Sequence, residues 1–319
     1  MTISSGEMRL YYAAQRNQTT PSANGGRPSQ TPVTCGQFGN IWPAVSEAER
    51  AAGATRCEKL FWRNLNSANE AGSNALVALA ATTGSDEYEW IVAGTQDNLQ
   101  SELSSSARRY SVGVLATPAA VGATTLTVTL PDASLSGCFA AGDTLILCTG
   151  NPDFGAGTAE IATLQSVSAS GTTLTLTLAS GLTRAFSGTA WCASCISVAA
   201  FAPSVTVTSG TFAGNIAVNN VGTIRQVWTA TYTTDGLQIV GDEVGNIGVF
   251  AISADIAPTN QSAGAPYFSI PADGHGSSPS GAFTFSTQAA AIGVFRFKTT
   301  PAGATVSTAT VPLICTCES

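Results

Sequence analysis

An alternation of apolar and polar residues with a period of two runs through much of the chain and predicts β-strands. It is clearest in two near copies, 123–130 and 171–178, in which threonine alternates with leucine or valine. This pattern places the aliphatic side chains in a core and the threonines at the surface, as a small sandwich or barrel requires. We therefore expect residues 116–196 to form one compact β module with an internal pseudo-repeat, inserted into a larger domain. The threonine faces could bind sugar or a partner, but solvated strand faces are the simpler interpretation.

Other strand-like runs lie on both sides of this module. Segments 74–81 and 87–93 fit two strands joined by a turn, although the alanine and leucine content of 74–81 also fits one or two helical turns. The later strand-like runs are 204–209, 223–234, 237–240, 246–252, 281–287 and 291–299. Gly-rich turns separate them at the spacing of an all-β sandwich. We expect residues 35–115 to be the first part of a main β domain and residues 197–319 to be a C-terminal β-sandwich domain.

Two segments lack this strand pattern. Residues 15–30 are rich in Asn, Gln, Thr, Ser, Pro and Gly, a composition typical of an extended arm or a long loop. We expect residues 1–34 to form an extended N-terminal arm that orders against a neighbour, with a disordered tail as the alternative. Segment 258–280 is too long for a simple hairpin, and loops of this length are usually functional or disordered. The predicted fold is therefore all-β and multi-domain, with sandwich or barrel-like modules, an N-terminal arm and one short helix.

The one predicted helix lies in segment 36–66, the densest mixture of aromatic, charged and capping residues in the chain. Ser46 followed by Glu49 is a capping-box pattern, and Gly53 supplies the residue at which such a helix ends. A helix of at most about two turns is too short to be stable alone and needs support from neighbouring elements. The run 55–65 that follows has no cleanly apolar face, so we expect a strand with contacts on both of its sides.

The same segment carries a family resemblance. Asn-Ile-Trp-Pro-x-Val-Ser-x-Ala-Glu-Arg-x-Ala-Gly-x-Thr at 40–55, followed by a basic and aromatic strand, resembles the N-terminal region of structural proteins from tailed bacteriophage virions. The sequence departs from that pattern at Cys57-Glu58-Lys59, where an aromatic residue followed by basic residues is expected. The resemblance implies a tail-associated or other particle-bound protein, and it brings no catalytic residues with it.

Composition and charge narrow the functional classes. The 319 residues suffice for about two or three domains. Only 10% of them are charged, against about 25% in average globular proteins, which suits β-rich surfaces that become buried in an assembly. The net charge of −7 argues against a nucleic-acid partner. No apolar run is long enough for a membrane span, and residues 1–16 lack the features of a signal peptide, so we expect synthesis and folding in a cytoplasm.

The eight cysteines comprise two close pairs and four scattered residues: Cys192 and Cys195, Cys315 and Cys317, Cys35, Cys57, Cys138 and Cys148. Simple thiols are the favoured interpretation, because a cytoplasm opposes disulfide formation. The two close pairs could instead supply four thiolates to a zinc ion. Cys138 and Cys148 flank one hairpin-like segment and are therefore a plausible pair for a disulfide.

Candidate catalytic groups are few. The only histidine, His275, lies between Asp273 and Ser277, but a catalytic triad needs groups that converge from different elements of the fold. Asp242-Glu243 is an adjacent acidic pair for which a turn is the simpler account. The chain contains no nucleophile elbow, Walker loop or His-Glu-x-x-His motif. We therefore expect no enzymatic activity, no cofactor and no metal site.

We expect a non-enzymatic structural protein of a tailed-phage virion that joins or locks subunits in the tail or baseplate region. Its partners would be other virion proteins and further copies of the chain. The candidate subunit-contact residues are Ile41, Trp42, Glu49, Arg50, Lys59, Phe61, Trp62 and Arg63.

Two alternatives remain at this stage. A head decoration, or cement, protein would place the chain elsewhere in the same particle. A carbohydrate-binding adhesive β protein, with a host glycan as ligand, would require exposed aromatic platforms, for which the candidates are Trp228, Tyr232, Tyr267 and Phe268.

Overall fold

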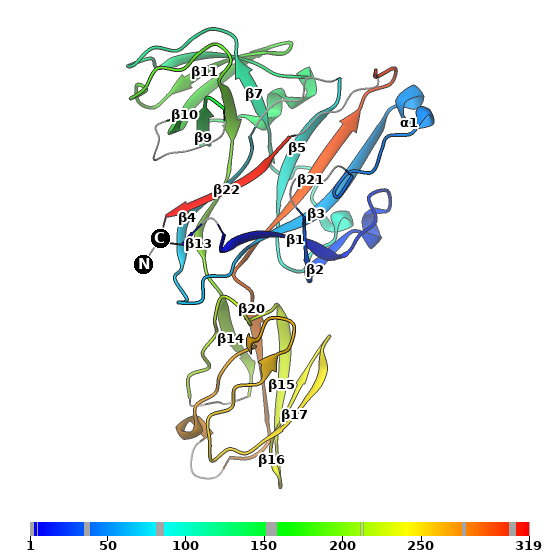
Figure 1. Ribbon diagram of the computed structural model, residues 1–319, viewed down its shortest axis with the longest axis vertical. Helices are drawn as coiled ribbons and strands as arrows, with labels where there is room; N and C mark the ends of the chain where they lie inside the picture. The colour runs from blue at the N-terminus through cyan, green and yellow to red at the C-terminus, as the bar shows by residue number, and fades with distance from the viewer. Residues whose placement is uncertain are drawn as a thin grey trace.

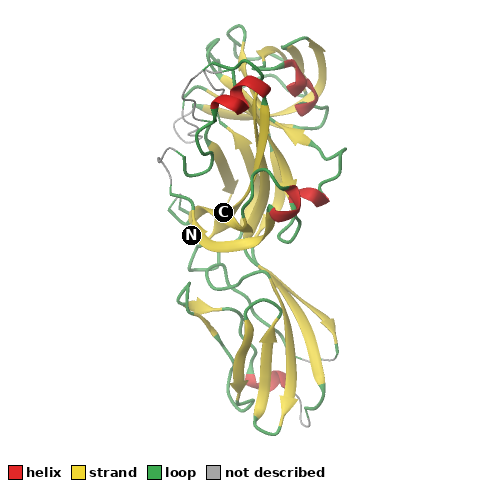
Figure 2. Ribbon diagram, turned by 90° about the vertical axis from the view of Figure 1, so that its right-hand side faces the viewer, coloured by secondary structure: helices red, strands yellow, loops and turns green. Residues whose placement is uncertain are grey.

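The computed structural model describes residues 3–4, 6–34, 39–80, 86–150, 158–210, 212, 214–275, 279–305 and 311–318. In these ranges the chain forms 22 strands, one short α-helix and four 3-10 helices, arranged as an elongated molecule with both termini near its middle (Figures 1 and 2). The all-β, multi-module prediction with one short α-helix is confirmed.

The central part of the molecule, here called the body, consists of two facing sheets. One has six strands in the order β2 (Gly25–Pro32), β1 (Met8–Gln15), β3 (Ala54–Asn64), β21 (Ala291–Thr300), β5 (Tyr88–Gly94) and β6 (Arg109–Tyr110). The other has three strands in the order β13 (Ile196–Phe201), β4 (Gly72–Leu79) and β22 (Leu313–Glu318). The helices of the body are η1 (Pro21–Ala23), α1 (Glu47–Ala52) and η2 (Gln100–Glu102).

The core of the body lies between these sheets. Leu60 of β3, Val294 of β21 and Val77 of β4 are fully buried in it, and complete burial of such a side chain stabilises the fold by about 1.5–3 kcal/mol. Residues 74–79 of the segment that also fitted helical turns belong to strand β4, because β13 pairs with one edge of this strand and β22 with the other. A central strand that is covered in this way has a continuous apolar run.

The N-terminal segment differs from the extended arm expected for residues 1–34. Residues 8–15 form β1, which pairs with β3, and residues 25–32 form β2, which pairs with β1. The polar, proline-containing sequence of β2 is tolerated because it is the outermost strand and its pairing with β1 is interrupted by register shifts. Proline is confined to such edge strands because it cannot donate to the next strand.

The second module is a closed six-stranded barrel at one end of the molecule (Figure 1). Its strands are β7 (Val112–Leu115), β8 (Thr125–Thr129), β9 (Thr144–Cys148), β10 (Ala159–Ser170), β11 (Thr173–Leu178) and β12 (Trp191–Ser194), with η3 (Ala133–Cys138) between β8 and β9. The two threonine-rich near copies are the adjacent strands β8 and β11. Their aliphatic residues Leu126, Val128, Leu174 and Leu176 are buried, as the alternation predicts.

The third module, residues 204–288, lies at the opposite end and is here called the distal domain (Figure 2). Its main sheet has the order β14 (Ser204–Ser209), β20 (Ala282–Gln288), β15 (Gln226–Thr233), β16 (Gly236–Gly241) and β17 (Gly245–Phe250). One face packs against the segment that carries β18 (Thr259–Asn260), β19 (Ala265–Pro266) and η4 (Ala272–His275). Segment 258–280, expected to be a functional or disordered loop, supplies the fully buried Phe268 and Ile270 to this core.

The strand pairing divides the chain differently from the expected C-terminal domain 197–319. Strands β13, β21 and β22 belong to the body, and only residues 204–288 between them form the distal domain. The barrel, 112–194, corresponds closely to the module expected at 116–196. The body is thus built from strands β1–β6, β13, β21 and β22. The barrel is inserted between β6 and β13, and the distal domain is inserted between β13 and β21.

Candidate subunit-contact element and the domain junction

The short helix α1 forms as the capping pattern predicts. The Ser46 hydroxyl accepts a hydrogen bond from the Glu49 N–H, and the Glu49 carboxylate accepts one from the Ser46 N–H at 2.8 Å. The C-cap residue Gly53 has φ 78°, a conformation that glycine adopts without strain. None of the helix residues is buried. The helix is therefore held by its caps and by side-chain contacts to the neighbouring strand.

The main contact is an ion pair between Glu49 and Arg56 of β3. Arg56 donates from Nη2 to Oε1 and Oε2 of Glu49, both at 2.7 Å, and also donates to the Pro43 carbonyl at 2.8 Å. The hydrogen bonds from Arg56, together with those from Ser46, lower the pKa of Glu49 to about 2. Glu49 thus fixes α1 to the six-stranded sheet.

Replacing Glu49 with glutamine is expected to destabilise the protein by about 0.5–1 kcal/mol, because it removes the negative charge that pairs with Arg56, whereas glutamine can still accept the capping hydrogen bond. The pKa of Glu49 in the folded chain lies below its ordinary value of 4.5. The carboxylate therefore contributes stability above that value, and the contribution is lost as the pH falls towards about 2. Thermal unfolding at pH 7 and at acidic pH should show a smaller pH effect in E49Q than in the parent. The matched control is E47Q, in the same helical turn but outside the capping box, and an equal effect in both variants would contradict this role.

The structure distributes the eight candidate contact residues between surface and interior. Lys59, Phe61 and Arg63 are buried, with at most 2% of their surface exposed. The partly exposed residues are Ile41, Trp42, Glu49, Arg50 and Trp62. Ile41 and Trp62 pack against the core of the body. The exposed side of α1 and the partly exposed residues 41–42 therefore form the part of segment 36–66 that is accessible to another molecule.

The strand β3 has contacts on both sides, as its sequence indicates. On one side Leu60 and Trp62 contribute to the core between the two sheets. On the other side Phe61 packs with Tyr11, and the guanidinium of Arg63 lies 5.0 Å from the ring of Tyr11. Arg63 also donates to the Val221 carbonyl of the distal domain at 3.3 Å. Two residues expected to contact other subunits thus stabilise this chain internally.

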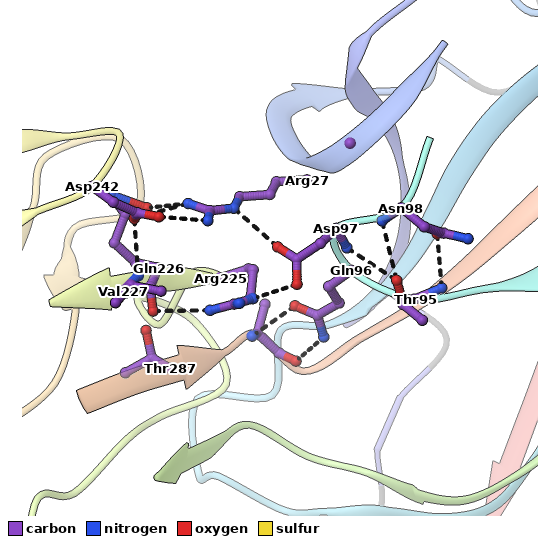
Figure 3. A network of polar contacts seen from close by, with 12 residues as sticks. Arg27, Thr95, Gln96, Asp97, Asn98, Arg225, Gln226, Val227, Asp242 and Thr287 are labelled. Carbon is purple, nitrogen blue, oxygen red and sulfur yellow. Dashed lines mark hydrogen bonds and ion pairs between the residues drawn. The ribbon is translucent and has the colours of Figure 1, made fainter. Parts of the chain in front are cut away.

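A polar network joins the body to the distal domain (Figure 3). Arg27 of β2 donates to both carboxylate oxygens of Asp242, at 2.9 and 2.6 Å, and to Gln226 at 3.0 Å. It also donates to Asp97 at 3.1 Å, and Asp97 accepts a second hydrogen bond from Arg225 at 2.8 Å. The hydrogen bonds to Asp242 raise the pKa of Arg27 above its ordinary value. The body and the distal domain therefore each contribute one arginine and one aspartate, and each arginine pairs with the aspartate of the other module.

Two further sets of hydrogen bonds hold the junction. Gln96 binds the segment that connects β20 to β21, donating to the Ala289 and Ala291 carbonyls at 2.8 and 3.1 Å and accepting from the Ala289 N–H at 3.0 Å. Within the distal domain, the Asn220 N–H donates to Asn69 of the body at 3.0 Å, and the Asn220 side chain donates to the Glu70 carbonyl at 2.9 Å. The connection from β20 to β21 and the segment of the distal domain that carries Asn220 are thus fixed to the body.

The outer face of the distal sheet is uncharged. None of its five strands contains a charged residue, and the register places Thr229, Val240 and Thr284 on one face. Val240 and Val249 are 37% and 48% exposed. A surface of this kind lacks the charges by which soluble proteins usually resist association.

The candidate catalytic histidine lies in the distal domain, enclosed by aromatic rings. His275 is 7% exposed, its Nδ1 lies 3.0 Å from the Tyr232 hydroxyl, and the rings of Phe212 and Tyr232 contact it edge-on. Burial lowers the pKa of His275. Ser277, the candidate hydroxyl group near His275, lies outside the described residues. Asp242 of the adjacent pair Asp242-Glu243 belongs to the junction network.

The aromatic residues that a glycan-binding platform would need are mostly internal. Trp228 and Phe268 are fully buried, and their rings contact each other at 5.0 Å. Tyr232 and Tyr267 are partly buried and pack against the same core.

Seven of the cysteines lie in the described ranges. Six of these carry free thiols: Cys57, Cys138, Cys192, Cys195, Cys315 and Cys317. The seventh, Cys148, is buried. Cys35 lies outside these ranges. No cluster of three or more metal-ligating side chains occurs among the described residues. In the same part of the chain, no helix has the length and hydrophobicity needed to cross a membrane.

No known protein-family model matches the chain, and no curated protein matches its sequence.

Proposed function

We propose that this chain is a structural protein of a tailed-phage virion, without catalytic activity of its own, that joins or locks subunits in the tail or baseplate region. The observation that carries this proposal is the polar junction. It fixes the inserted distal domain to the body, so that surfaces on these two modules are held at a constant separation. A protein that connects neighbours within a particle needs this property. The placement in a tailed phage rests on the resemblance of residues 40–55.

The available surfaces support a role in an assembly. The uncharged outer face of the distal sheet and the exposed helix α1 lie on different modules, so one chain can contact two neighbours at once. Further copies of the same chain and other virion proteins are the proposed partners. The low content of charged residues is expected where such surfaces are covered in the particle.

The amount of the chain in purified particles tests this proposal. Particles of the phage that encodes it should be separated on a density gradient and analysed by quantitative mass spectrometry. We expect a constant number of copies per particle that is retained after a high-salt wash. A chain that is absent from the particles and free in the lysate would contradict a virion role and would favour the adhesive or the enzymatic class.

A further inference from the structure

Lys59 is a buried lysine that forms no ion pair with any of the residues that the structure describes. Its side chain is completely buried, and its Nζ lies 5.0 Å from the centres of the Phe61 and Phe295 rings. The carboxylates of Asp97 and Glu102 interact with it electrostatically, without a hydrogen bond. Burying an ammonium group without an adjacent anion is costly, so chemistry that removes this charge is thermodynamically favoured.

The contacts of Lys59 lead directly to the junction. Nζ donates to the Gly26 carbonyl at 2.8 Å, to the Asn98 carbonyl at 2.6 Å and to the Asn98 side-chain oxygen at 3.0 Å. Gly26 and Asn98 are the chain neighbours of Arg27 and Asp97, which pair with Asp242 and Arg225 of the distal domain. The amine of Lys59 is therefore in contact with an amide on the loop that holds the distal domain.

We propose that Lys59 and Asn98 condense to an intramolecular isopeptide bond. The neutral Nζ attacks the side-chain amide carbon of Asn98, so that an Nζ–Cγ bond forms and the Cγ–Nδ2 bond breaks. One proton passes from Nζ to Nδ2, which leaves as ammonia. The step balances without an oxidant or other co-reactant, and the product is a neutral secondary amide in place of a buried charge.

The geometry is favourable for this step. Since a C=O bond is about 1.23 Å long, the amide carbon of Asn98 lies within about 4.3 Å of Nζ. The Thr95 N–H donates to the same amide oxygen at 3.0 Å and is placed to stabilise the negative charge that develops there. Burial lowers the pKa of Lys59 to about 7, so a substantial fraction of the amine is neutral at physiological pH.

A single slow turnover suffices. The reaction occurs once in the lifetime of each molecule, and holding two groups together is equivalent to effective concentrations of about 10⁵–10⁸ M in well-oriented cases. The product would tie β3 covalently to the loop at 95–98. This loop binds Arg27, Arg225 and the connection to β21. The cross-link would therefore restrict the movement of the loop that holds the junction. The inference does not depend on a virion role.

Intact-mass measurement of the purified full-length chain tests the cross-link. We expect a mass that is lower by one ammonia molecule than the mass calculated from the sequence, whereas the N98A variant should have its full calculated mass. The chain contains only two lysines, Lys59 and Lys298, so digestion of the denatured protein with a lysine-specific protease adds a second test. The protease should cut after Lys298 and leave Lys59 intact, because an acylated lysine is not recognised.

Two variants complete the design. In N98A, cleavage after Lys59 should be restored, whereas K298R should retain the ammonia loss, because Lys298 is paired with Glu87 elsewhere in the body. A parent chain with the full sequence mass that is cut at both lysines would overturn the proposal, even if N98A fails to fold. Loss of ammonia with normal cleavage after Lys59 would also overturn it, because a cyclised asparagine or glutamine would then be the source.

Discussion

Replacing Arg27 with alanine is expected to release the distal domain from its fixed position on the body. The substitution removes the hydrogen bonds to Asp242, Gln226 and Asp97 and leaves two carboxylates near each other at the junction. Hydrogen bonds to charged groups contribute about 1.5–3 kcal/mol each when well enclosed. Because Asp97 and Asp242 are partly exposed, we expect a total loss of docking free energy of about 1–3 kcal/mol after allowance for solvent screening.

Small-angle X-ray scattering and thermal unfolding measure this effect. R27A should show a broader distribution of interatomic distances than the parent, and the distal domain should unfold at a lower temperature than the body. The matched control is R184A, which removes an exposed arginine of the barrel. Scattering and unfolding profiles of R27A that match those of the parent would mean that the polar network does not position the distal domain.

Replacing Arg296 with methionine is expected to give the largest loss of stability, about 3–5 kcal/mol, because it leaves a buried carboxylate without its partner. Arg296 of β21 pairs with Glu89 of β5 at 2.5 Å, and both side chains are at most 5% exposed. Arg296 also donates to the Val311 carbonyl at 2.5 Å, which connects the six-stranded sheet to the start of β22. The loss should appear as a lower urea midpoint with an unchanged m-value.

A double variant separates the charge from the packing. E89L/R296M removes both charges, and buried ion pairs can often be replaced by apolar residues with little loss of stability. We expect this variant to recover most of the stability that R296M loses, with the bond to Val311 accounting for the remainder. A double variant as unstable as R296M alone would show that the unpaired carboxylate is not the cause.

The features that the sequence predicted well depend on neighbouring residues. The capping box of α1 needs only Ser46 and Glu49, and the burial pattern of β8 and β11 follows from the alternation of threonine with leucine or valine. In both cases the physical cause, a local hydrogen bond or a period of two, lies within a few residues. The all-β class could be predicted for the same reason.

The domain boundaries depend on pairing between distant segments, which no local pattern reports. Strand β21 follows the last distal strand closely in the sequence, yet it pairs with β3 and β5 of the body. The N-terminal arm was expected because residues 15–30 are polar and rich in proline. That composition fits an edge strand equally well.

The candidate site was predicted only in part. Charged and aromatic residues on β3 suggested an exposed contact surface, but Lys59 and Arg63 are buried because the strand is central and both of its faces are covered. The junction residues Arg27, Asp97, Arg225 and Asp242 come from four separate segments and carry no common motif. The adjacent pair Asp242-Glu243 was the one visible signal, and it indicated only a turn.

Immunogold electron microscopy of purified virions, with an antibody against the barrel at residues 112–194, tests the proposed role most directly. We expect label at the tail or its tip, at positions that repeat from particle to particle. Label over the head would contradict the tail placement and support a decoration protein. Unlabelled particles, with the protein free in the lysate, would contradict the virion role altogether.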